Sequence, residues 1–134
     1  MENTKAVLNK TFDLFLDTFK EYYSSLTSLG DQERKKQISE YYKFCCKLTD
    51  ILISLDSLTS NIANHIHTRN ALNEDENVIE FSAMFENAII LRRIAEQFLT
   101  ETESFIQRSP NIMSTELKKQ TDIAIRKILM LKST

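Results

Sequence analysis

The chain is almost without glycine and proline: among 134 residues it has one of each, Gly30 and Pro110. These residue types mark most turns and interrupt most helices and strands. A chain that nearly lacks them leaves little room for the frequent turns that an all-β fold requires. We therefore predict a mostly helical protein.

Long apolar runs are also missing, since stretches such as 88–91 end after four residues. A membrane-spanning helix needs about 20 apolar residues, so we expect no membrane span. No apolar segment precedes the first charged residue, Glu2, which argues against export through a cleavable leader. The net charge of −2 gives no overall preference for nucleic acid or anionic lipid.

The chain has only two cysteines, Cys45 and Cys46, and these are adjacent. Neighbouring side chains on a helix point about 100° apart, so the two thiols cannot bridge one another. Cys45 falls on a seam, by which we mean a line of apolar residues along one face of a predicted helix. At such a position a cysteine behaves as a small hydrophobic residue. We expect reduced thiols and a cytoplasmic location.

What the chain does have is apolar residues at alternating intervals of three and four, the spacing of an amphipathic helix. The pattern predicts helices over approximately 4–29, 32–70, 75–108 and 115–132 within a single domain, 1–134. Ser114 or Thr115 is the expected N-cap of the last helix. The predicted seams comprise Leu8, Phe12, Phe15, Phe19, Tyr22, Leu26 and Leu29; Ile38, Tyr41, Cys45, Leu48, Leu52, Leu55, Ile62 and Ile66; Phe81, Met84, Ala88, Leu91, Ala95, Phe98 and Phe105; and Leu117, Thr121, Ala124, Ile128 and Leu131.

Four helices joined by short connections are typical of an up-down-up-down bundle. The two central helices are predicted to be longer than the outer two. The expected fold is thus an all-α, antiparallel four-helix bundle with two long central helices.

Candidate metal and catalytic groups are sparse. His65 and His67 are two residues apart and face opposite sides of a helix, whereas helical zinc ligands are four apart. The acidic cluster over 74–76 and Glu80 lacks the glycine of a calcium loop, and it suits the positive end of a helix dipole. No base, nucleophile or paired acid stands out. We expect no metal, no cofactor and no enzymatic activity.

The last predicted helix is the basic element of the chain. Its five cations and two acids give it a charge of +3, which leaves −5 for the rest. Such a helix can bind anionic lipid, nucleic acid or an acidic partner, or it can dock on its own acidic bundle. We favour docking. The cations are Lys118, Lys119, Arg126, Lys127 and Lys132.

Two features indicate a surface used for association. The third and fourth helices carry apolar residues beyond one seam, which predicts a homodimer interface represented by Ile90, Ile94, Ile125 and Met130. All four tyrosines flank Gly30 in sequence, and tyrosine is enriched at binding surfaces. The residues predicted to bind a partner are Tyr22, Tyr23, Tyr41 and Tyr42.

The function expected from these observations is a regulatory, non-enzymatic protein-binding module of the inhibitor, immunity-protein, chaperone or adaptor type. This list rests on analogy between folds. The alternatives are a small-ligand or nucleotide sensor with a pocket between helices, and nucleic-acid binding through the last helix. The net negative charge weighs against the latter.

Overall fold

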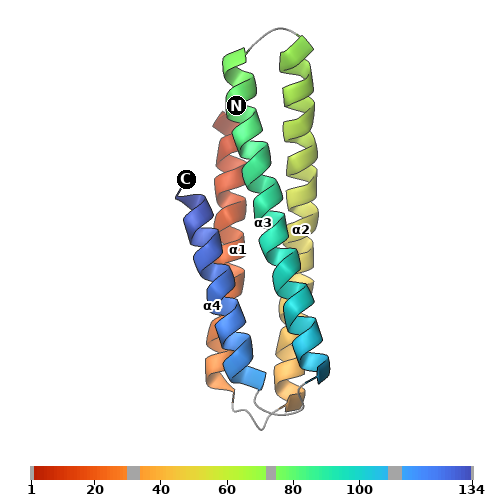
Figure 1. The fold of residues 1–134 in the computed structure, drawn as a ribbon, viewed down its shortest axis with the longest axis vertical. Helices are drawn as coiled ribbons and strands as arrows, with labels where there is room; N and C mark the ends of the chain where they lie inside the picture. The colour runs from red at the N-terminus through yellow and green to blue at the C-terminus, as the bar shows by residue number, and fades with distance from the viewer. Residues whose placement is uncertain (1, 30–33, 72–74, 109–112, 134) are drawn as a thin grey trace.

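The computed structural model describes residues 2–29, 34–71, 75–108 and 113–133, and within these ranges it contains four helices and no strand. The helices pack against one another along their lengths (Figure 1). The prediction of an all-α bundle is therefore confirmed. The helices are α1 (Glu2–Ser28), α2 (Arg34–Ala71), α3 (Asp75–Arg108) and α4 (Met113–Lys132).

The four helices differ in length. α2 and α3 have 38 and 34 residues, whereas α1 and α4 have 27 and 20. α1 packs against α2 and α4, α3 packs against the same two helices, and the diagonal pairs meet much less. Figure 1 shows that one end of α2 and α3 extends past the last turn of α4. Within the described chain, that end of the bundle is built without α4.

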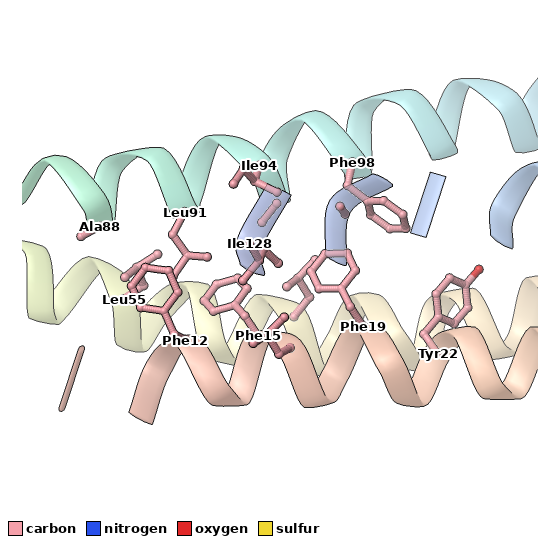
Figure 2. Packing of buried hydrophobic residues seen from close by; sticks show 14 of the residues in the cluster. Phe12, Phe15, Phe19, Tyr22, Leu55, Ala88, Leu91, Ile94, Phe98 and Ile128 are labelled. Carbon is pink, nitrogen blue, oxygen red and sulfur yellow. The ribbon is translucent and has the colours of Figure 1, made fainter. Parts of the chain in front are cut away.

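The core follows the seams that spacing predicts. Phe15 and Phe19 on α1 are fully buried, as are Leu55 on α2, Leu91 on α3 and Ile128 on α4. Figure 2 shows these side chains converging between the helices. Removing an aliphatic or aromatic side chain of this size from water contributes roughly 1.5–3 kcal/mol to stability. Apolar burial along all four helices therefore holds the bundle together.

Threonines occupy two seam positions, and both are fully buried. The hydroxyl of Thr102 donates to the carbonyl of Phe98 at 2.7 Å, and that of Thr121 donates to the carbonyl of Leu117 at 2.6 Å. Each hydroxyl is thus satisfied by the preceding turn of its own helix. This explains how a polar residue fits into an apolar seam.

The start of α4 differs from the expected capping. α4 begins at Met113, so Ser114 lies inside the first turn, where it is buried. The choice of Ser114 or Thr115 as N-cap is therefore wrong, because the helix starts before both residues. Gly30, Pro110 and Glu74, which also enter the sequence argument, lie outside the described residues.

Candidate functional site

The structure divides the four tyrosines into a buried pair and an exposed pair. Tyr22 and Tyr41 are buried, while Tyr23 and Tyr42 are exposed. The ring of Tyr42 lies against Tyr41 at a centroid distance of 5.7 Å. Tyr23 instead lines a groove with residues of α4. The two tyrosines that a partner could reach therefore have different neighbours.

The buried pair belongs to an aromatic cluster that joins three helices. Tyr22 stacks on Phe44 with ring centroids 4.5 Å apart and planes inclined by 20°. Phe19 makes edge contacts with Phe44 at 5.1 Å and with Phe98 at 5.0 Å. Figure 2 shows Phe19 and Phe98 approaching one another from α1 and α3. Such pairs add about 0.5–1.5 kcal/mol each beyond burial, so the cluster fixes this part of the bundle.

The two buried tyrosines differ in their hydrogen bonding. The hydroxyls of Tyr41 and Thr102 are 2.9 Å apart. Because Thr102 already donates to Phe98, Tyr41 is the donor in this bond. The Tyr22 hydroxyl has no hydrogen-bond partner among the described residues. Burial raises the pKa of both phenols above the usual value near 10, so neither serves as a base at neutral pH.

This difference predicts opposite effects of removing each hydroxyl. Tyr41→Phe should lower the free energy of unfolding by about 1 kcal/mol, because it deletes a buried hydrogen bond. Tyr22→Phe should leave stability unchanged or raise it by up to about 1 kcal/mol, because it deletes an unpaired buried polar group. Urea denaturation followed by circular dichroism measures both. Equal losses in the two variants would contradict this assignment.

The predicted dimer residues have unequal exposure. Ile94 is buried, while Ile90 and Ile125 are partly buried against the core. Met130 is 71% exposed. Ile94 also lines a shallow groove between α3 and α4 together with Ile123, which is 37% exposed. Apolar side chains from both helices thus gather along this outer seam.

Ile123 and Met130 lie on the same side of α4, since residues seven apart are separated by two helical turns. Ile90 and Ile94, four apart, share one side of α3. We name these four residues the α3–α4 strip. A recurring apolar spacing outside the main seam is the sequence signal that identifies Ile123 as a member.

A second groove lies between α1 and α4 and has a volume of about 420 Å³. Most of its charged residues are cations. Arg126 is paired within the groove, its Nε lying 3.0 Å from Oδ2 of Asp122. We name it the α1–α4 groove, and its lining residues are Tyr23, Thr115, Lys118, Lys119, Asp122 and Arg126.

Sequence reasoning identified the cations of this groove but not its shape. The three-four spacing shows how each side chain is directed relative to its own seam. It does not say which neighbouring helix lies beside Tyr23. Placing Tyr23 next to Lys118 and Lys119 required the packing of α1 against α4.

The remaining candidate groups have structural surroundings. The ring of His65 stacks on the buried ring of Phe81, with centroids 4.9 Å apart and planes inclined by 8°. Cys45 is partly buried against the core and Cys46 is exposed; both are free. Burial raises the pKa of the Cys45 thiol, which disfavours the reactive thiolate.

Within the described ranges, no three histidine, cysteine or acidic side chains are arranged to hold a metal ion. Glu74 lies outside those ranges, and the side chains of Asp75 and Glu76 are likewise not described. Glu80 lies 4.0 Å from the ammonium group of Lys5. None of the four helices, over the residues described, is both long and apolar enough to cross a bilayer.

The groove and the strip are each assembled from two different helices. Each combines residues that lie far apart in the sequence. Comparison of the chain with protein-family models, with curated proteins and with solved structures finds no match.

Proposed function

We propose that this protein is a regulatory, non-enzymatic protein-binding module of the cytoplasm that forms a homodimer. The observation that carries the proposal is the 71% exposure of Met130, which lies two turns after the exposed Ile123 on the same side of α4, a helix that already supplies a full core face. A helix in a monomeric bundle needs one apolar stripe. A second apolar stripe on α4 is explained if another protein surface covers it.

The direction of the helices supports an antiparallel, up-down-up-down arrangement with two long central helices. Along α2 and α3, Tyr41 meets Thr102, Asp56 pairs with Arg92, and His65 meets Phe81. Rising numbers on one helix thus match falling numbers on the other. The same reversal relates α1 to α4, where Tyr23 lies beside Lys118 and Asp13 pairs with Lys132.

This antiparallel arrangement would bring Met130 of α4 and Ile94 of α3 to similar levels along the bundle. Nζ of Lys127 lies 3.5 Å from Oε1 of Gln97. Met130 follows Lys127 by about one turn, and Ile94 precedes Gln97 by about one turn. If the two helices are antiparallel, a step toward higher residue numbers on α4 and a step toward lower numbers on α3 move the same way along the bundle axis. Met130 and Ile94 therefore occupy neighbouring places, and two copies of the strip could cover one another across a two-fold axis.

The dimer is tested by sedimentation equilibrium of the full chain and of Met130→Glu. We expect the wild-type chain to sediment as a dimer. Met130→Glu should be a monomer at the same concentration, because the two-fold axis places two unpaired carboxylates in a desolvated interface. The expected loss in dimer affinity is about 100-fold or more, equivalent to roughly 3 kcal/mol.

Ile53→Glu is the matched control. Ile53 is 63% exposed on α2 and lies outside the strip, so this variant adds the same charge at another apolar surface residue. It should remain a dimer. A wild-type chain that is monomeric throughout would refute the homodimer, and a dimer disrupted by Ile53→Glu but not by Met130→Glu would refute the interface.

A further inference from the structure

The α1–α4 groove contains cations that lack acidic partners among the described residues. Arg126 pairs with Asp122, whereas Lys118 and Lys119 form no ion pair there. Lys118 is partly buried and Lys119 is exposed. The groove therefore presents two ammonium groups whose charge the bundle itself does not neutralise.

Docking of α4 on its own acidic bundle accounts for other cations of this helix. Lys132 pairs with Asp13 of α1, and Lys127 reaches Gln97 of α3. Lys118 and Lys119 take no part in these contacts. Docking of α4 on the bundle therefore explains the positions of Lys127 and Lys132. It does not explain Lys118 and Lys119 of the groove.

The groove also offers apolar surface beside the cations. Tyr23 is 38% exposed at its edge. Leu129 is exposed on α4, and it lies seven residues after Asp122, on the same side of the helix. A ligand that complements this surface carries acidic groups together with an apolar side chain. An acidic, amphipathic stretch of polypeptide has this composition.

The size of the groove favours a short ligand. From Thr115 to Arg126 the rise along α4 is about 16 Å, the length of about three helical turns or five extended residues. On α1, Asp17 is exposed, while Glu21 pairs with Lys47 of α2 on the other side of the helix. The chain outside α4 has a charge of −5. A long polyanion or an anionic membrane would extend beyond the groove over a chain whose remaining charge is negative, which disfavours both.

We propose that the α1–α4 groove binds a short acidic segment of a partner protein. Carboxylates of the segment pair with Lys118 and Lys119, and an apolar side chain of the segment packs on Tyr23. This proposal names the partner class of the protein-binding function inferred above and rests on it. The groove is distinct from the α3–α4 strip, so dimerisation and segment binding are separable.

The test uses a fluorescein-labelled twelve-residue peptide of repeated Glu-Glu-Leu units, with a Gln-Gln-Leu peptide as the uncharged control. Fluorescence anisotropy with the full chain should detect binding of the acidic peptide that weakens as salt is added. The Gln-Gln-Leu peptide should bind at least about tenfold more weakly, because it cannot form the charge pairs.

Charge-reversal variants locate the binding surface. The double variant Lys118→Glu, Lys119→Glu should lose about tenfold or more in affinity for the acidic peptide, because attraction is replaced by repulsion. The control is Lys10→Glu, Lys35→Glu, which makes the same change in net charge at exposed lysines outside the groove. It should bind within about threefold of the wild-type chain, since distant exposed charges are screened. Tyr23→Ala should weaken binding without altering the salt dependence.

Several outcomes would overturn the proposal. These are no binding of the acidic peptide to the wild-type chain, equal losses in both double variants, and equal binding of both peptides. Oligodeoxythymidine and vesicles of phosphatidylserine and phosphatidylcholine are tested in parallel. Groove-dependent binding of either of these, without binding of the peptide, would assign the groove to nucleic acid or to membrane instead.

Sedimentation of the same variants separates this proposal from the dimer. The Lys118→Glu, Lys119→Glu variant should remain a dimer, because neither residue belongs to the α3–α4 strip. If the chain is a dimer but does not bind the acidic peptide, only the groove assignment is overturned. A monomer that binds the peptide through the groove would overturn the dimer alone.

Discussion

A chain that ends at Ser114 should lose cooperative unfolding and aggregate. The deletion removes Leu117 and Ile128, which are both fully buried, along with the buried residues Thr121 and Ala124. Truncating one buried leucine or isoleucine to alanine costs about 2–5 kcal/mol, and a domain is stable by only about 5–15 kcal/mol. Losing the whole inner face of α4 should therefore exceed the stability of the protein.

Thermal denaturation followed by circular dichroism, together with light scattering, measures this effect. The matched control ends at Leu131, which removes Lys132 and its exposed ion pair with Asp13 but keeps the core face. That variant should lose about 1 kcal/mol or less. If the chain ending at Ser114 did not aggregate and melted cooperatively, α4 would be an appended recognition element rather than a part of the core.

Phe19→Ala should be the most destabilising single substitution among those discussed here. Phe19 is fully buried and makes edge contacts with Phe44 and Phe98, so its removal leaves a cavity where α1, α2 and α3 meet. The expected loss in the free energy of unfolding is about 3–5 kcal/mol.

Urea denaturation measures this loss, with Leu14→Ala as the control on the same helix. Leu14 is 45% exposed, so its truncation should cost less than about 1 kcal/mol. Comparable destabilisation by both substitutions would mean that α1 is rotated about its own axis, so that a different face of the helix is buried. That result would contradict the seam on which the fold rests.

Much of the core could be predicted from spacing alone. Phe12, Phe15 and Phe19 lie on one face because residues three and four apart share a side of a helix, and all three are buried. Buried Thr121 fills an expected step of its seam, and buried Thr102 lies between the seam residues Phe98 and Phe105. The pattern works because a bundle buries one continuous stripe of each helix.

The surfaces were less predictable because they depend on two helices at once. Ile94 lies beside the predicted seam of α3, yet it is buried, since α3 packs against both α2 and α4 and its inner face is broad. Tyr23 and Tyr42 are close to the same turn in sequence, but Tyr23 lies beside α4 whereas Tyr42 lies against Tyr41. Periodicity on one helix does not contain this information.

We propose that α4 completes the core with one face and binds protein with another. Amide hydrogen exchange of the full chain, read by mass spectrometry at low and at high protein concentration, tests both parts directly. We expect peptides from 113–132 to be protected at low concentration, as in a docked helix, and to exchange more slowly at high concentration. Exchange of α4 at the rate of an unstructured peptide, or rates that do not depend on concentration, would contradict the account.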